Sequence, residues 1–313
     1  MVKRIVVKQK FTDEQMKKKD GQFFDENCCK KIYNESVDVY TEEGELLLKF
    51  RKNVLSNEDC DKLFELKGAA QSSIRPSASG IKKGEPKYIY VRSKSTGKKL
   101  CIQTCKNRVR SGIVGYYDTI SNFGQHHNKE INKTNVKCRL TAYTSRNMDK
   151  FKGCLPVFKK IDRIYKKLVP AHYKVQKSSI NKINKNFVIK DTIFTTVTVN
   201  KNFRTALHCD VGDLKEGFGN LIVVSKGDYE GACTMFPQYE VGVDCRNGDF
   251  LAMNVHKWHC NSKMKGDKDA ERLSFVFYLR EKMIRACSRS TKRSGSKSKS
   301  KSKSKSKSKS KSK

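Results

Sequence analysis

The segment Phe203-Arg-Thr-Ala-Leu-His208-Cys-Asp210 constrains this chain more than any other. It carries a His and a carboxylate two residues apart, and a second His follows about fifty residues later. Two imidazoles and one carboxylate form a face that suits Fe(II) and leaves the other coordination positions open. The second imidazole is that of either His256 or His259, because both lie in the segment Val255-His256-Lys-Trp-His259.

An Arg that follows the second His suggests what occupies the open positions. Arg272 and Ser274 lie two apart in a β-pattern, so their side chains face the same side of a strand. A bidentate Arg beside a hydroxyl matches the distal carboxylate of 2-oxoglutarate. The alternative is an ordinary surface ion pair between Arg272 and Asp269 or Glu271. The four residues together predict an iron oxygenase that uses 2-oxoglutarate as cosubstrate.

Two further residues near the motif are candidates for substrate contact. Asp213 lies five residues after His208 and either accepts a hydrogen bond from a substrate amine or caps the turn that follows. Arg204 is either a contact for nucleic acid or a solvated loop residue. The sequence leaves both pairs of alternatives open.

The charge of the chain favours a polyanionic partner. Lys and Arg number 67 against 32 Asp and Glu, a formal net charge of +35. Residues 285–313 hold 13 Lys/Arg and no acid, so the rest carries 54 − 32 = +22. Such a body favours nucleic acid first and an anionic membrane second, whereas a solvated lysine-rich surface is the plainer explanation. No run of 18 apolar residues is present, so we expect no membrane span.

The cysteines indicate a reducing compartment. Twelve are scattered without a regular framework, and the start Met1-Val-Lys-Arg leads into no apolar signal region. We therefore expect free thiols in a protein of the nucleus or cytoplasm, an origin in a viral genome being compatible with this. Cys101 and Cys105, with Cys138 and Cys154, could hold zinc, but their spacing is weak and ordinary thiols are favoured. No pattern predicts an oligomeric state.

Hydrophobic periodicity predicts an α+β fold whose core is a double-stranded β-helix, or jelly roll, with flanking helices. Helical spacing over residues 155–169 ends before Pro170 and predicts a scaffold helix. From residue 187 the period changes to two, which is typical of an antiparallel barrel or jelly roll. The expected strands cover residues 192–199, 220–224, 233–236, 250–253 and 273–278.

The same patterns divide the chain into three parts. Residues 1–100 form an N-terminal extension with a hairpin at 37–40 and 46–50 and a helix that a capping box opens at Ser56. Residues 101–284 form the oxygenase domain. Residues 285–313, in which Ser and Lys alternate from Ser296, form a disordered basic tail.

Several of these segments together resemble a known family. They are Val109-Arg110-Ser111-Gly112, the stretch from Lys167 to Gln176, the stretch from Val199 to Asp210, Trp258-His259, and Arg272. This combination resembles the TET/JBP superfamily of Fe(II)/2-oxoglutarate dioxygenases, which oxidise the 5-methyl group of pyrimidines in nucleic acid.

The resemblance implies roles for individual residues. His208, Asp210 and His259 would hold Fe(II), which favours His259 over His256 as the second imidazole. Arg110 and Arg272, the latter with Ser274, would hold the two ends of 2-oxoglutarate. Asp213 stands where some members carry an Asn that contacts the target base and others an Asp.

The resemblance also implies a reaction, in which a flipped-out 5-methylcytosine or thymine is hydroxylated, and it favours DNA over RNA as the substrate. Two alternatives remain open. A 2-oxoglutarate-dependent protein hydroxylase would use the same site but would not need so basic a body. A non-catalytic nucleic-acid-binding protein would need the charge but not the intact ligand set.

Overall fold

The fold is built on one large sheet and one small sheet that face each other. It is known from a computed structural model, which describes residues 2–73, 78–80, 88–92, 96–97, 99–103, 109–118 and 138–287. The mixed α+β class predicted from the periodicity is confirmed.

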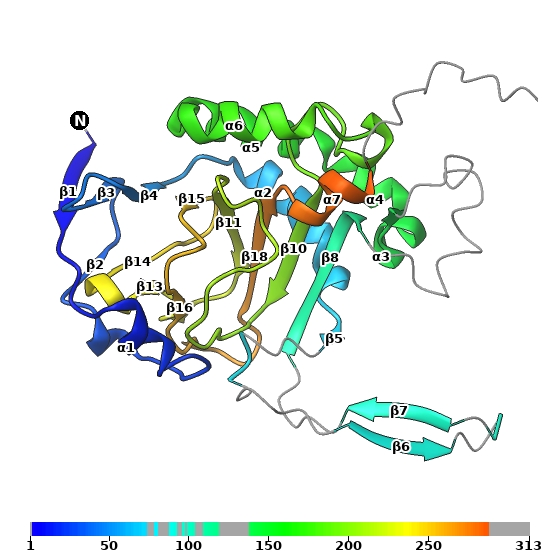
Figure 1. Cartoon of the computed structure of the whole chain (residues 1–313), viewed down its shortest axis with the longest axis horizontal. Helices are drawn as coiled ribbons and strands as arrows, with labels where there is room; N and C mark the ends of the chain where they lie inside the picture. The colour runs from blue at the N-terminus through cyan, green and yellow to red at the C-terminus, as the bar shows by residue number, and fades with distance from the viewer. Residues whose placement is uncertain are drawn as a thin grey trace, which may run out of the picture.

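The large sheet runs through the middle of the molecule (Figure 1). Its strands are antiparallel except that β1 pairs with β3 in parallel. The strand order is β1 (Lys3–Val7), β3 (Val37–Thr41), β4 (Leu46–Arg51), β15 (Phe250–Met253), β11 (Gly219–Lys226), β18 (Glu271–Tyr278), β10 (Thr196–Lys201), β8 (Val109–Tyr117) and β5 (Ser72–Ser73), with β9 (Arg139–Leu140) also paired to β8.

The small sheet carries one ligand segment. Its strand order is β16 (Cys260–Asn261), β13 (Thr234–Phe236), β14 (Val241–Val243) and β2 (Lys31–Tyr33). Because β16 begins directly after His259, this sheet places that residue against the large sheet. Two further strand pairs are β12 (Tyr229–Glu230) with β17 (Lys265–Gly266), and β6 (Tyr88–Arg92) with β7 (Lys99–Gln103).

Helices cover the other face of the large sheet (Figure 1). The predicted scaffold helix is confirmed, and Pro170 opens the next helix at a position that needs no backbone N–H. The capping box at Ser56 is also confirmed, since its hydroxyl accepts from the Asp59 amide. The helices of this layer are α2 (Asn57–Phe64), α3 (Ala142–Arg146), α4 (Met148–Gly153), α5 (Leu155–Leu168), α6 (Pro170–Ile180) and α7 (Glu281–Ala286). Helix α1 (Asp13–Lys17) instead lies beside the small sheet (Figure 1), where Met16 packs with Met235 and Cys260.

Alternation along the strands separates two apolar cores. On β18, Phe275 and Phe277 pack against the helices, whereas Val276 faces the small sheet. The core between the sheets combines residues of both, such as Leu221 and Phe236. All five strands predicted after residue 187 are present, with ends shifted by up to four residues.

The predicted N-terminal extension is continuous with the rest of the fold. The predicted hairpin is confirmed as β3 and β4, and β4 pairs directly with β15. The strand β1 extends the large sheet, and β2 joins the small one. Residues 2–73 therefore contribute strands to both sheets, although no pattern in the sequence predicts these pairings. The predicted basic tail lies outside the described residues, apart from residues 285–287.

The prediction that the cysteines are free thiols is wrong for one pair. Cys138 and Cys287 form a disulfide that joins the segment before β9 to the end of α7. Cys138 is therefore not available to zinc, and the Cys154 thiol instead lies 3.1 Å from the Lys62 carbonyl. Cys105 lies outside the described residues. Sequence spacing could not predict the pair, because its members are 149 residues apart.

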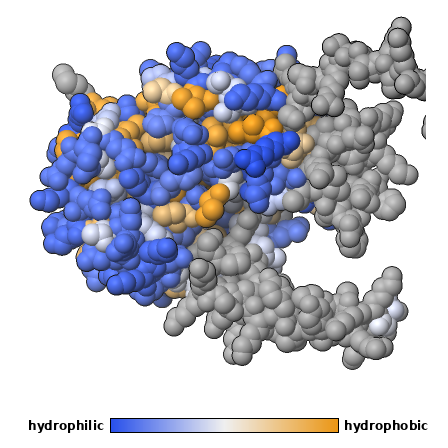
Figure 2. All heavy atoms as spheres, in the orientation of Figure 1, coloured by the Kyte–Doolittle hydropathy of each residue, from blue (hydrophilic) through white to orange (hydrophobic). Residues whose placement is uncertain are grey.

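The surface agrees with the composition. Figure 2 shows hydrophilic residues over much of the visible face, with apolar residues gathered beside the helical layer. In the part of the chain that the structure describes, no helix is both long enough and apolar enough to cross a bilayer.

The helix-facing core predicts a large cost for truncating one aromatic. Phe277 is fully buried, and its ring lies 5.1 Å from that of Phe158 and 5.5 Å from that of Phe194. We expect Phe277→Ala to lower the free energy of unfolding in urea by about 3–5 kcal/mol, because it leaves a cavity. Val175→Ala, at an exposed position, is the control. A loss for Phe277→Ala no larger than for the control would contradict this packing.

Candidate metal centre and adjoining cavities

Two loop segments meet through their backbones to build the centre. The amide of His208 donates to the carbonyl of His259 at 3.0 Å, and the amide of His259 donates back at 3.0 Å. The amide of Asp210 donates to the carbonyl of Val255 at 2.9 Å. His208 lies seven residues past the end of β10, so main-chain pairing between loops, rather than a strand end, positions it.

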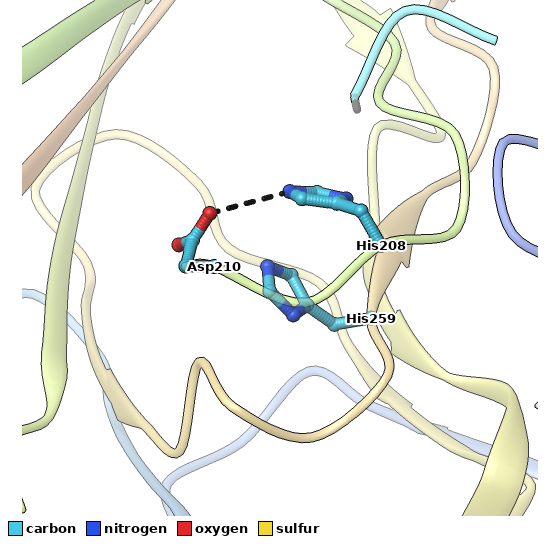
Figure 3. A group of neighbouring side chains, drawn as sticks. All are labelled: His208, Asp210 and His259. Atoms are coloured by element: carbon cyan, nitrogen blue, oxygen red, sulfur yellow. Dashed lines mark ion pairs between the residues drawn. The ribbon is translucent and has the colours of Figure 1, made fainter. Parts of the chain in front are cut away.

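Three side chains converge at this bridge, as Figure 3 shows. One possible ligand atom from each of His208, Asp210 and His259 lies within 4.8 Å of the others. The His208 Nε2 is 3.6 Å from an Asp210 carboxylate oxygen, and the two imidazole rings are 4.4 Å apart. Both imidazoles are buried, whereas Asp210 is partly exposed. Among the described residues, no other group of three His, Cys, Asp or Glu is this close.

Both imidazoles are oriented by backbone carbonyls. The Nδ1 of His208 lies 2.8 Å from the Ala206 carbonyl, and the Nδ1 of His259 lies 2.9 Å from the Lys257 carbonyl. Such bonds place the proton on Nδ1 and leave Nε2 with a lone pair for a metal. Burial, with the neighbouring His208, lowers the pKa of His259 to about 4, so its ring is neutral at physiological pH.

His256 has a different role from His259. Its Nδ1 lies 3.1 Å from the Asp210 carbonyl, and its Nε2 lies 3.1 Å from the Leu214 carbonyl. Both ring nitrogens therefore face main-chain oxygens instead of the ligand cluster. The structure brings His259, and not His256, together with His208 and Asp210.

A cavity of about 300 Å³ opens beside the three candidate ligands. Ser274 lines it, and the Asn200 side-chain amide lies 3.5 Å from the Ser274 hydroxyl. Polar side chains from β8, β10 and β18 form much of this wall, although the sheet is otherwise apolar. They include Ser111, Thr198, Asn200, Ser274 and Tyr278.

Arg272 is buried on the same side of β18 with donors unused. It is 4% exposed, and its Nε and Nη2 have no hydrogen-bond partner. A buried guanidinium without partners is costly, so an anion that binds there would satisfy donors that the protein leaves open. The alternative of a surface ion pair does not hold, since Arg272 is buried and Glu271 pairs with Lys201 and Lys67.

Asp213 and Arg280 lie together on the cavity wall. Their backbones form a short antiparallel bridge, and one carboxylate oxygen of Asp213 is buried without a partner. Burial and the nearby Asp210 raise the pKa of Asp213 well above its ordinary value. Arg280 donates to Asp118 and lies 4.2 Å over the Tyr117 ring. No sequence motif singles out Arg280, although the alternation of β18 continued by two residues places it on this face.

Arg110 and Arg204 lie elsewhere. Both line a second cavity of about 960 Å³, which shares Phe203 with the first. Arg110 is exposed there, and Arg204 is bound to the N-terminal segment, its Nη2 lying 2.8 Å from Asp25. The structure thus brings the predicted ligands, Ser274 and Asp213 together around one cavity, and buries Arg272 two residues before Ser274 on β18. It places Arg110 and Arg204 at the second cavity.

A family model settles the relationship of the chain. The model Tet_JBP, described as the oxygenase domain of the 2OGFeDO superfamily, matches residues 119–281, which is more than half of the chain. The chain belongs to this family. The matched range contains all three candidate ligands, Arg272 and Arg280, whereas Arg110 lies before it.

Relatives within the Tet_JBP family carry names that state an activity. The chain is 33% identical over 184 residues to the bifunctional helicase and thymine dioxygenase JBP2 of Leishmania infantum, covering 58% of this chain and 16% of the relative. It is 33% identical over 174 residues to the thymine dioxygenase JBP1 of Trypanosoma brucei brucei, covering 54% and 19%. The chain therefore spans less than a fifth of the length of these relatives.

A solved structure shows the same fold. The complex of NgTET1 with 5mC DNA superposes with a TM-score of 0.50 at 13% identity, covering 82% of this chain and 81% of that one. The superposition thus extends well beyond the range that the Tet_JBP model matches.

The two histidines near residue 258 predict losses of metal affinity that differ in size. We expect His259→Ala to weaken Co(II) binding at least a hundredfold, because it removes a direct ligand. His256→Ala should weaken it by about tenfold, the usual effect of losing a residue that only supports ligands. Titration followed by the visible absorption of Co(II) measures both. Equal losses of affinity in the two variants would contradict the assignment of His259 as a metal ligand and His256 as a supporting residue.

Proposed function

We propose that the chain is an Fe(II)/2-oxoglutarate-dependent dioxygenase that hydroxylates the 5-methyl group of a pyrimidine, thymine or 5-methylcytosine, in nucleic acid. The observation that carries the proposal is the cluster of His208, Asp210 and His259 in the matched range, in which both imidazoles are buried. The names of the relatives, which act on thymine, support a methylated base as the substrate.

The three clustered side chains fit Fe(II). Two imidazoles and one carboxylate are the donor set of the facial triad, and the two rings are oriented by carbonyls at Nδ1, which leaves each Nε2 for the metal. When bound, the iron would activate O₂ and permit oxidation of an unactivated methyl group. The contribution of the protein is to hold the three donors and to keep bulk water from two of them by burial.

The unused donors of Arg272 fit the distal carboxylate of 2-oxoglutarate. Its Nε and Nη2 are buried and unpartnered, and the Ser274 hydroxyl lies on the same side of β18. A bidentate guanidinium and a hydroxyl together would bind and orient that carboxylate. We retain Arg110 as the proposed contact for the other end of the cosubstrate, although in this structure it faces the second cavity.

The target base would have to leave its helix to enter. The ligands are buried beside a cavity of about 300 Å³, so a methyl group inside a duplex cannot reach them. We propose that Asp213 and Arg280 contact the edge of the flipped base, because both line this cavity. Arg204, at the rim formed with Phe203, would lie closer to the neighbouring backbone of the nucleic acid.

The charge supports a nucleic-acid substrate, and the relatives favour DNA over RNA. A protein hydroxylase would use the same donors but has no such support. We also propose that the two facing sheets form a double-stranded β-helix and that the protein acts inside the cell, where DNA is present.

The reaction predicts a defined change in nucleosides. With Fe(II), 2-oxoglutarate and O₂, we expect DNA containing thymine or 5-methylcytosine to yield the 5-hydroxymethyl base. Mass spectrometry of digested nucleosides, with RNA and a peptide library in parallel, measures it. Asp210→Ala should abolish the product because it removes an iron ligand. Oxidation of peptides without any change in bases would instead establish a protein hydroxylase.

The buried Arg272 predicts a trade of stability against cosubstrate binding. We expect Arg272→Met to be at least as stable as the wild type without ligand, since it replaces an unpaired buried charge with an apolar side chain. With metal, a saturating unreactive analogue of 2-oxoglutarate should stabilise the wild type by about 3 kcal/mol at a hundred times its Kd. Thermal unfolding should show no such gain for the variant. An equal gain would exclude Arg272 from the cosubstrate site.

A further inference from the structure

The backbone before His208 is held by segments from the N-terminal region. The amide of Ala206 donates to the carbonyl of Ala78 at 2.9 Å. Leu207 makes two backbone hydrogen bonds with the segment at residues 21–22. Its amide donates to the Gln22 carbonyl at 2.8 Å, and its carbonyl accepts from the Gly21 amide at 2.9 Å. The two residues that precede the first ligand are thus fixed by two different segments, at residues 21–25 and 78–80.

A further hydrogen bond connects this held segment to the candidate ligand itself. The Ala206 carbonyl orients the His208 ring through Nδ1 at 2.8 Å. The same residue is held from its amide side by Ala78. A shift of Ala206 would therefore move the acceptor that sets the direction of the His208 Nε2.

Arg204 joins the same loop to the first segment through its side chain. Its Nη2 donates to the Phe24 carbonyl at 2.9 Å and to the Asp25 carboxylate at 2.8 Å. Its guanidinium lies 4.9 Å from the centre of the Phe23 ring. Because the Asp25 side chain is 67% exposed, the carbonyl and the ring should contribute more than the ion pair.

The two N-terminal segments also pack on each other. Gly80 has φ +73°, and a Cβ there would lie 2.5 Å from Phe23 Cε2 and 3.4 Å from the Gly21 carbonyl oxygen. The positive φ would strain any side chain at residue 80. Phe23, which is 45% exposed, would also have to shift to make room.

We propose that residues 21–25 and 78–80 form a clamp that positions His208, so that affinity for the metal depends on a region before the matched oxygenase range. Arg204 is then a positioning residue that fastens the loop to the clamp. This inference rests on the proposed function only in taking His208 as a metal ligand. It assigns a role to part of the N-terminal region, for which the sequence suggested none.

The test compares metal affinity in the full chain. Arg204→Gln removes the stacked guanidinium, and Gly80→Ala displaces Phe23. Arg246→Gln is the matched control, because Arg246 makes the same three kinds of contact, with the Tyr229 ring at 4.5 Å, the Tyr229 carbonyl at 2.6 Å and Asp244 at 2.7 Å. Co(II) is the probe, since it binds such donors at least as tightly as Fe(II).

We expect Arg204→Gln and Gly80→Ala each to weaken Co(II) binding by about 10- to 100-fold, the effect of losing support behind a ligand. Arg246→Gln should bind like the wild type even if its melting temperature falls equally. Unchanged affinity in both clamp variants, or an equal loss in the control, would overturn the proposal. Circular dichroism establishes that each variant is folded. Asp25→Asn keeps the contacts of Arg204 with the Phe24 carbonyl and the Phe23 ring, so it should lose less Co(II) affinity than Arg204→Gln.

A second measurement separates this inference from the proposed function. Hydrogen exchange without metal should be faster at the amides of Ala206 and Leu207 in Arg204→Gln than in the wild type, and unchanged in Arg246→Gln. If the wild type fails to bind Co(II), the proposed metal centre is wrong, yet faster exchange at these amides still supports the clamp. Unchanged exchange would overturn the clamp whatever the metal result.

Discussion

The reciprocal pair of backbone hydrogen bonds between His208 and His259 is the interaction on which the site depends. It joins two loop segments about fifty residues apart and sets their imidazole rings 4.4 Å from each other. Side chains alone could not do this, because each has rotamers that point elsewhere and the loops have many conformations. Once the bridge has fixed the two backbones, only the orientation of the rings remains free. The Ala206 and Lys257 carbonyls set that orientation.

The division of β18 into two faces explains how one sheet carries both the core and the chemistry. Phe275 and Phe277 pack the sheet against the helices, and the alternate residues of β18, such as Val276, face the other way. That second face begins with Arg272 and Ser274 and continues to Arg280 beyond the strand. A strand whose apolar side is fully engaged can hold unsatisfied polar groups on its other side at a cost that the core offsets.

Much of the oxygenase half could be predicted from the sequence. The strands after residue 187, helix α5 and the cluster of His208, Asp210 and His259 follow from alternation, helical spacing and the resemblance. The strands and the helix are encoded by patterns within short segments of the sequence. The choice between His256 and His259 could not be made from spacing, because either could reach the cluster and only the carbonyls around His256 distinguish them.

The features that could not be predicted from the sequence are contacts between segments that lie far apart in the chain. The disulfide of Cys138 with Cys287, the insertion of β2 beside β14 and the contact of Arg204 with Phe24 each join segments far apart in the chain. No periodicity encodes such partners. Arg110 shows the converse, since a motif predicted its role but its exposed side chain faces the neighbouring cavity.

The pairing of β4 with β15 has a consequence for how this domain can be divided. A fragment cut to the matched oxygenase range would keep β15 and lose β4, leaving a row of backbone amides and carbonyls open along the edge of the large sheet. The strand is apolar, with Phe250, Leu251 and Met253 all buried in the intact protein. Such an edge is a template for pairing with other chains, so the first strands also act as a cover against self-association.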